Sequence, residues 1–310
     1  MHIQFPQYKD QIQYVTNGVH PHTWISQKFS ELFENFPETF PDFKNNPMIL
    51  SRAVELKSNS DFRAKIWQTH QSNKADLCKL LGKWSLDKNL FTICWARRIA
   101  AYKRPSLILH DISRLVRISK ETGPLQIILA GKAHPNDNLG FTYINEMLDK
   151  VDKLNEDYNK LKIIVLENYD ISLGKILTSC VDVWLNNPLP PFEASGTSGM
   201  KAILNGVLQM TTVDGWVAEV ADKKIGAFFG YRNSEGSVGN ENDLHMNDDA
   251  EELYRALEML AGLYYKTNQA GKLKNSSEWI DMMIECICTG ARFNTYRMLD
   301  QYKKDIWHID

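Results

Sequence analysis

Five short apolar runs alternate with amphipathic stretches between residues 89 and 213, and this alternation constrains the fold more than any other feature. The apolar runs have the length of buried strands, and the stretches between them repeat apolar residues with a helical period. Strands that alternate with helices indicate a parallel sheet with right-handed crossovers. The predicted strands are FTICWA (91–96), LQIILA (125–130), KIIVLEN (162–168), VDVWLN (181–186) and VLQMTTV (207–213). The predicted helices between them cover residues 104–119, 138–156, 172–179 and 196–206.

The segments on either side of this core have a different texture. Residues 1–88 are irregular and rich in aromatic side chains, with short helices predicted near 61–70 and 74–80. After the core, residues 248–266 and 276–307 predict two further helices, the second of them long. We therefore expect an α/β fold with a Rossmann-like, doubly wound parallel sheet in residues 89–310 and a helical or irregular appendage in residues 1–88.

Composition disfavours several classes of protein. The 310 residues are 43% hydrophobic and carry a formal net charge of −2, so a general nucleic-acid or membrane-surface binder is not expected. No apolar run approaches the roughly 20 residues of a membrane span, and the amino terminus lacks the apolar core of a signal peptide. The five cysteines show neither zinc nor disulfide spacing, which favours a reducing cytoplasm.

A basic cluster follows the first predicted strand, where ligands bind in doubly wound sheets. The segment RRIAAYKR contains Arg97, Arg98, Lys103 and Arg104 around Tyr102. Cations are unfavourable near a helix amino terminus unless an anion is bound there, so a cluster at a strand end that opens a helix indicates one or two phosphates. A solvated basic face is the alternative interpretation.

A second segment, EASGTSGMK (193–201), places a lysine among apolar residues. The helix start near Gly196 would offer free backbone N–H groups to a phosphate, and Lys201 lies one turn beyond Thr197 on the same face. This arrangement suits pyridoxal phosphate, because a buried lysine has a lowered pKa, as an amine that reacts with an aldehyde requires. An ordinary glycine-containing helix start with a snorkelling lysine explains the pattern equally well. The spacing excludes a Walker A loop.

Other polar residues give weaker signals. His20 and His22 alternate as in a metal site, but no third ligand is apparent, so we predict no metal. Asp182, Asp214 and Glu219 are candidate general acids or bases, although a carboxylate beside a glycine is more often a turn residue.

Taken together, these segments resemble the α-glucan (glycogen, starch and maltodextrin) phosphorylases, in the form of the shorter bacterial and archaeal branch. The resemblance runs in family order over residues 15–219. It rests on TNGVHPHTW (16–24), ARRIAAYKRP (96–105), LAGKAHP (129–135), VLENYDISLGKIL (165–177), LNNPLPPFEASGTSGMKAILNGV (185–207) and TVDGW (212–216).

The resemblance implies that the sheet is the carboxyl-terminal domain of a glycosyltransferase-B architecture, whose long last helix crosses back to the other domain. It implies phosphorolysis of an α-1,4-glucan to glucose 1-phosphate with pyridoxal phosphate, and assigns Lys201, Arg98 and Lys103 to catalysis. Lys201 would be bonded to the cofactor. The cofactor would also be held by Gly196, Thr197, Arg97, Lys103 and Tyr169, and the substrate by Asn17, Arg98, Tyr102, Glu193, Ser195 and Gly196.

The resemblance covers only the carboxyl half of that architecture. The other half would complete the cleft, so we expect the chain to need a separate amino-terminal polypeptide or self-association for turnover. Two other functions remain open: half of a nucleotide-sugar glycosyltransferase of the glycogen-synthase kind, and a non-catalytic carbohydrate-binding remnant. Nucleotide-sugar glycosyltransferases of this kind often have two Glu residues that are eight positions apart. The residue eight positions after Glu193 is Lys201, which favours the phosphorylase.

Overall fold

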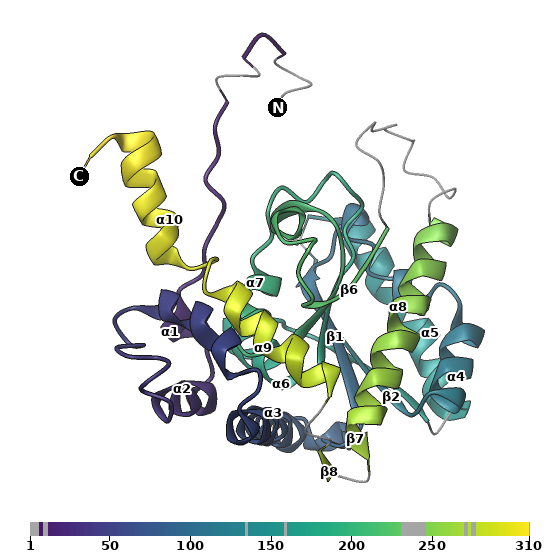
Figure 1. The fold of residues 1–310 in the computed structure, drawn as a ribbon. Coiled ribbons are helices and arrows are strands. Elements are labelled where there is room, and N and C mark those ends of the chain that lie inside the picture. Colours follow the sequence, from purple (N-terminus) through teal and green to yellow (C-terminus); the bar gives the residue numbers. More distant parts are fainter. Residues whose placement is uncertain are drawn as a thin grey trace.

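The computed structural model describes residues 6–8, 12–133, 136–157, 160–230, 246–269, 272–273 and 277–309. Its centre is a six-stranded, fully parallel sheet with the order β3-β2-β1-β4-β5-β6 (Figure 1). The strands are β1 Phe91–Arg98, β2 Leu125–Lys132, β3 Leu161–Leu166, β4 Val183–Asn186, β5 Leu208–Thr212 and β6 Gly226–Phe229. This order is that of a doubly wound sheet, so the predicted fold class is confirmed. The sixth strand was not predicted.

Helices cover both faces of the sheet and form the appendage before it. Each of the strands β1 and β2 buries alternate side chains on opposite faces in two apolar clusters, as a doubly covered sheet requires. The α-helices are α1 Pro21–Trp24, α2 Gln27–Glu34, α3 Ser60–Leu80, α4 Ile112–Glu121, α5 Asn138–Asp157, α6 Ile171–Cys180, α7 Ser198–Ile203, α8 Met246–Thr267, α9 Glu278–Gly290 and α10 Thr295–Gln301. Short 3-10 helices include η2 Pro47–Leu56, η4 Ala101–Lys103, η5 Leu107–Leu109 and η6 Gly215–Glu219.

Side-chain caps explain where several helices begin. Asn59 accepts a hydrogen bond from the amide of Phe62 at 2.9 Å and starts α3, and Asp111 does the same for α4. Asp170 accepts from the amide of Leu173 at 2.8 Å and starts α6. A short polar side chain at each first position thus satisfies N–H groups that the helix itself leaves free.

The appendage shares one core with the sheet domain. Phe29, Phe33 and Phe62 belong to the same buried apolar cluster as Ile93 and Trp95 of β1. The two short helices predicted near 61–70 and 74–80 are a single helix, α3, because no glycine or proline interrupts its 21 residues. The division of the chain at residue 88 stays a prediction.

The predicted long last helix is wrong. Residues 278–301 form two helices, α9 and α10, separated at 291–294, and α10 continues as a π-helical turn, η7 (Tyr302–Trp307). Asn294 caps the second helix by accepting from the amide of Arg297 at 2.9 Å. In the break, the amide of Val19 donates to the carbonyl of Phe293 at 2.9 Å and the amide of Thr295 donates to Val19 at 3.0 Å. Tertiary contacts with the amino-terminal segment therefore replace the helical bonds, and α10 stands away from the body beside that segment.

Within the described ranges, no helix is both long and apolar enough to cross a membrane.

Candidate active site

The order in which the strands are added to the sheet reverses between β1 and β4, which lie side by side and lead to loops 99–104 and 187–197. Crevices at such a reversal, beyond the carboxyl ends of the strands, bind ligands in doubly wound folds. The amide of Leu189 donates to the carbonyl of Tyr102 at 2.7 Å, so the two loops are hydrogen-bonded to each other. Most of the predicted site residues lie on these loops or immediately beside them.

Three of the predicted charged residues meet in one cluster. Nη2 of Arg97 lies 2.8 Å and Nζ of Lys103 lies 2.7 Å from the same oxygen, Oε2 of Glu193. All three side chains are largely buried, with exposed fractions of 8%, 6% and 11%. Burial alone would raise the pKa of Glu193, but Lys103 and Arg97 outweigh it and hold that pKa below its ordinary value. Glu193 is therefore ionised at neutral pH.

Arg97 has hydrogen-bonding capacity that the protein does not use. Among the described residues, its Nε and Nη1 atoms have no partner, although both are buried. Burial lowers the pKa of Arg97, opposed by Glu193, Tyr102 and Tyr169; a guanidinium stays charged nonetheless, because its ordinary pKa is above 12. Unpaired buried donors on a cation are costly, so they indicate a place for an anion.

Arg104 was predicted to belong to the same anion cluster, but the structure uses it differently. Its Nε donates to the carbonyl of Asn187 at 2.9 Å and its Nη2 to that of Pro188 at 3.1 Å, and it is paired with the buried Asp249. Arg104 thus clamps the two loops together. The segment also does not open an α-helix: β1 extends to Arg98 and the short turn η4 follows, because Ile99 still pairs with the β2 edge through Lys132.

Lys201 lies on α7, whose first residue follows Thr197. Its backbone amide donates to the carbonyl of Thr197 at 3.1 Å, which confirms the one-turn spacing. The side chain is half-buried, and burial lowers the pKa of its amine. Nζ lies 3.8 Å from the ring centre of Trp24, a contact that sequence reasoning did not assign although Trp24 closes the motif TNGVHPHTW. Trp24 therefore covers the amine.

The residues between Glu193 and Lys201 form a tight turn. Gly196 has φ +75°, a conformation that side chains rarely adopt. Ser195 donates from Oγ to the carbonyl of Gly196 at 3.1 Å, and Ser195, Gly196 and Thr197 are all partly exposed. Within the described residues, the side chain of Thr197 makes no capping hydrogen bond to α7. These groups are accessible to a ligand.

The remaining predicted site residues, Tyr169, Tyr102, Arg98 and Asn17, differ in their burial and contacts. Tyr169 is half-buried and near Arg97, and burial raises the pKa of its phenol to about 12. Tyr102 lies under Lys103, with Nζ 4.5 Å from its ring centre. Arg98 is the last residue of β1 and is exposed, whereas the residues before it in the strand, Arg97 included, are buried. Asn17 is also exposed; its carbonyl accepts from Arg297 at 2.9 Å. His134 lies outside the described residues.

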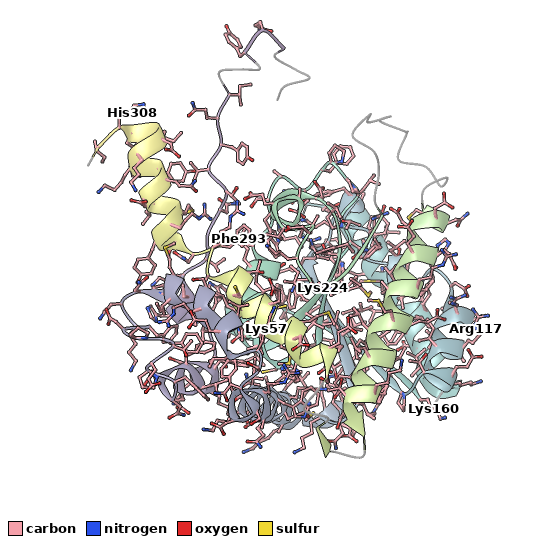
Figure 2. The ribbon with its side chains drawn as sticks, viewed as in Figure 1. Lys57, Arg117, Lys160, Lys224, Phe293 and His308 are labelled. Atoms are coloured by element: carbon pink, nitrogen blue, oxygen red, sulfur yellow. The ribbon has the colours of Figure 1, made fainter. Side chains whose placement is uncertain are left out.

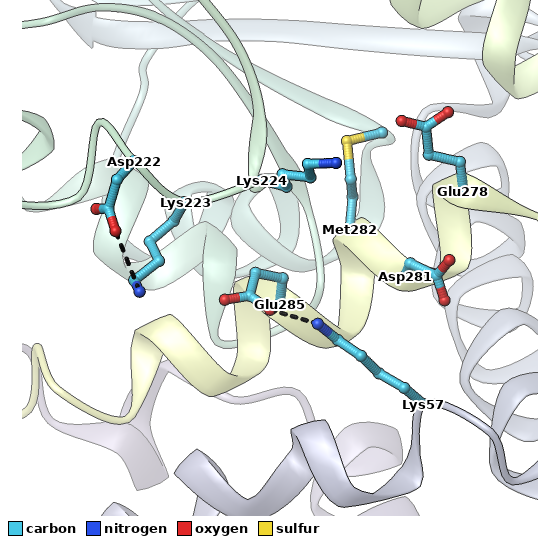
Figure 3. A pocket seen from close by; sticks show the side chains of 8 residues that line it. All are labelled: Lys57, Asp222, Lys223, Lys224, Glu278, Asp281, Met282 and Glu285. Atoms are coloured by element: carbon cyan, nitrogen blue, oxygen red, sulfur yellow. Dashed lines mark hydrogen bonds and ion pairs between the residues drawn. The ribbon is translucent and has the colours of Figure 1, made fainter.

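A polar cavity of about 270 Å³ lies elsewhere, where residues 222–224 and the start of α9 meet Lys57 (Figure 3). Its charges compensate one another: Lys57 pairs with Glu285 at 2.7 Å and Lys223 with Asp222 at 3.3 Å. None of the predicted site residues lines this cavity. Among the described residues, no three histidine, cysteine or acidic side chains are grouped as metal ligands.

Comparison with known proteins shows which family the chain resembles. The family model for carbohydrate phosphorylase matches residues 3–275. The maltodextrin phosphorylase of Thermococcus litoralis is 34% identical over 94% of this chain and 35% of its own length. The glycogen phosphorylase of Aquifex aeolicus is 34% identical over 96% of this chain and 44% of its own. The muscle glycogen phosphorylase of Macaca fascicularis is 26% identical over 95% of this chain. The chain thus spans less than half the length of these relatives.

Proposed function

Because the chain belongs to the carbohydrate phosphorylase family, we propose that it forms one wall of the active site of an α-glucan phosphorylase. The reaction is the phosphorolysis of an α-1,4-glucan to glucose 1-phosphate. The observation that carries this proposal is the buried guanidinium of Arg97 beside Lys103, at the point where the strand order reverses: its Nε and Nη1 have no partner among the described residues. Such a pair is suited to hold a phosphate.

Pyridoxal phosphate fits the residues present. Lys201 would hold it through the half-buried amine, whose lowered pKa favours the neutral form that reacts with an aldehyde. Its phosphate would lie against Gly196 and Thr197 and the free donors of Arg97, with Tyr169 beside the ring. When bound, the cofactor supplies a second phosphate that exchanges a proton with the substrate phosphate.

Electrostatics explains why the site needs several cations. Two unit negative charges about 4 Å apart repel by roughly 4 kcal/mol at an effective dielectric constant of 20. Arg97 and Lys103 offset this repulsion, and we propose that Arg98 contributes from the exposed side of the strand end. Since Nη2 of Arg97 is already bound to Glu193, one guanidinium can join the anion to the carboxylate.

Glucose would be bound by the groups that surround this cluster. We assign its hydroxyls to Glu193, Ser195, Gly196 and Tyr102, with Asn17 reaching it from the amino-terminal segment. Glu193 is suited to this role because an ionised carboxylate accepts strong hydrogen bonds from sugar hydroxyls, and Arg97 and Lys103 hold it in place.

The glucan must also be gripped from the opposite side. Since the chain spans 35% to 44% of the length of two of its relatives, we propose that a separate polypeptide supplies the other wall, a second copy of this chain being the alternative. Closing the cleft excludes water and strengthens the electrostatic contacts within it. We place the activity in the cytoplasm, where five free cysteines such as these stay reduced.

The test is the formation of glucose 1-phosphate from maltoheptaose and phosphate in the presence of pyridoxal phosphate. The chain is assayed alone and together with the part of a relative's chain that has no counterpart here, with Lys201→Arg as the control. We expect turnover only in the combined sample, and none with the variant. Robust turnover by the chain alone would show that the second wall is not needed. Release of glucose without phosphate, or no turnover in either sample, contradicts the proposed reaction.

A further inference from the structure

The turn TVDGW, residues 212–216, has no role in the function proposed above, yet it contacts the site directly. Oδ2 of Asp214 accepts a hydrogen bond from the backbone amide of Glu193 at 2.8 Å. Oδ1 accepts from the amide of Gly215, also at 2.8 Å. One carboxylate therefore joins the residue that binds Arg97 to the turn after β5.

Gly215 allows the turn and the Glu193 loop to lie in backbone contact. Its φ is +58°, and a Cβ at this position would lie 2.3 Å from the carbonyl oxygen of Ser195 and 2.9 Å from that of Glu193. The next amide, of Trp216, donates to that Ser195 carbonyl at 3.0 Å. Two hydrogen bonds, one accepted by Asp214 and one donated by Trp216, thus fix the loop at positions 193 and 195.

The turn is itself anchored on its other side. The buried ring of Trp216 packs edge-on against Phe293, with ring centres 4.9 Å apart. Figure 2 shows Phe293 at the base of α10. Glu219, at the end of η6, pairs with Arg292 at 2.6 Å and also accepts from Thr16. The turn therefore joins the break between α9 and α10, where the segment containing Asn17 docks, to the loop that carries Glu193.

We propose that Asp214 is a positioning residue for Glu193: its carboxylate fixes the backbone of that loop so that the Glu193 side chain lies between Arg97 and Lys103. The placement of a substrate-binding carboxylate then depends on a residue that touches no substrate. This inference rests on the proposed function for the role of Glu193, but the arrangement that it describes is tested without substrate.

The experiment follows the titration of the Glu193 side chain by NMR, with ¹³C-labelled glutamate and Glu193→Gln to identify the resonance. Two variants are compared with the unmodified chain: Asp214→Asn, which cannot accept both amides, and Asp214→Glu, which keeps the charge but is one methylene longer. Asp222→Asn is the matched control, since it removes one exposed charge from a nearby loop.

In Asp214→Asn we expect the titration midpoint of Glu193 to rise by about one unit, because the carboxylate moves away from its two cations. Removing the negative charge of Asp214 alone would shift the midpoint downward, so the sign separates positioning from simple electrostatics. The Glu193 midpoint in Asp214→Glu should lie between the midpoints in Asp214→Asn and in the unmodified chain. The midpoint in the control Asp222→Asn should equal that in the unmodified chain. A fall in thermal midpoint with no change in the Glu193 titration would mean that Asp214 is only structural, and overturns the proposal.

Phosphate affinity, measured on the same samples by calorimetry, keeps the two proposals apart. If Asp214→Asn shifts the Glu193 titration but the unmodified chain binds no phosphate, the proposed function fails and the positioning role stands. If Asp214→Asn does not fold, Asp214→Glu decides the matter in the same way: a Glu193 midpoint equal to that of the unmodified chain overturns the positioning role.

Discussion

Two buried clusters of charge lie at opposite ends of β1 and β4, and they differ in how fully their hydrogen bonds are used. At the amino end, Asp182 accepts from His70 at 2.8 Å, from Lys74 at 2.5 Å and from the amide of Thr92 at 2.7 Å. Lys74 donates in addition to the carbonyl of Leu90 and to the hydroxyl of Tyr264. At the carboxyl end, Arg97 leaves two donors without a partner among the described residues.

This difference separates a structural cluster from a site. Lys74 is almost fully buried, and burial would lower its pKa, but attraction to Asp182 outweighs it and the pKa lies above its ordinary value. Its three donors are all used, so no ligand is needed; among the described residues, the atoms here without a partner are Nδ1 of His70 and Nε2 of the neighbouring Gln71. The cluster joins α3 to the start of two strands. At the carboxyl end, the unused donors belong to Arg97, a permanent cation, and a phosphate would accept hydrogen bonds from them.

If the amino-end cluster is structural, removing one of its charges should destabilise the fold. Replacing Lys74 by Met leaves the Asp182 carboxylate buried with fewer partners, and the free energy of unfolding should fall by about 3–5 kcal/mol. Urea unfolding followed by circular dichroism measures this change. Lys65→Met, which removes an exposed pair with Asp61, is the control and should change stability by about 0.3–0.5 kcal/mol. A loss below about 1 kcal/mol for Lys74→Met, a typical exposed-pair value, would show that the network contributes little.

At the carboxyl end, the expected loss is in binding. Arg97→Gln removes the unused donors and should weaken the binding of inorganic phosphate about ten- to a hundredfold, the range for one charge-assisted contact. Arg98→Gln, from the exposed neighbouring position, should have a smaller effect. Calorimetry at low salt gives both affinities. Equal losses in the two variants would mean that the burial of Arg97 does not mark the anion site.

The lowered pKa of Lys201 predicts how its reactivity depends on pH. Because burial disfavours the ammonium form, a larger neutral fraction is present at a given pH than for an exposed lysine, whose pKa is about 10.4. The rate of adduct formation with pyridoxal phosphate should therefore reach half its maximum at a lower pH at Lys201 than in an unstructured peptide that carries one lysine. Mass spectrometry of samples quenched with borohydride follows the adduct in both. Identical pH profiles would contradict the effect of burial.

The smallest effect is expected in the polar cavity of Figure 3, where the charges are paired and at least partly exposed to solvent. Lys57 pairs with Glu285 at 2.7 Å, and the lysine side chain is 38% exposed. Lys57→Met should change the free energy of unfolding by about 0–1 kcal/mol, because water solvates the lysine and still reaches Glu285, whose side chain is 17% exposed. Urea unfolding checks this value, and a change near that of Lys74→Met would mean that burial does not separate the two kinds of pair.

Much of the fold follows from the sequence, because the hydrophobic pattern of a buried parallel sheet is local. All five predicted strands are present within a few residues of their predicted bounds. The sixth, β6, was missed because its four residues follow a charged turn and are only recognisable beside β5. The break between α9 and α10 was missed for a related reason: residues 291–294 are compatible with a helix, and contacts with Val19 interrupt it.

The residues of the candidate site could be predicted from the sequence, but their hydrogen-bond partners could not. Glu193 was predicted to bind glucose, and the sequence could not show that Arg97 and Lys103 share one of its oxygens. Arg104 was grouped with the anion-binding residues, yet its guanidinium is used by loop carbonyls and Asp249. A basic run shows that cations are close together; which of them retain free donors depends on partners about 80 to 150 residues away in the chain.

The most direct test of the central claim is to map where pyridoxal phosphate attaches. The chain is incubated with the cofactor at neutral pH and low ratio, reduced with borohydride, digested and analysed by mass spectrometry, with Arg97→Gln in parallel. We expect an adduct mainly on Lys201 and a weaker one in the variant, because the unused donors of Arg97 would hold the cofactor phosphate. Adducts spread over exposed lysines such as Lys88, with none on Lys201, would contradict it.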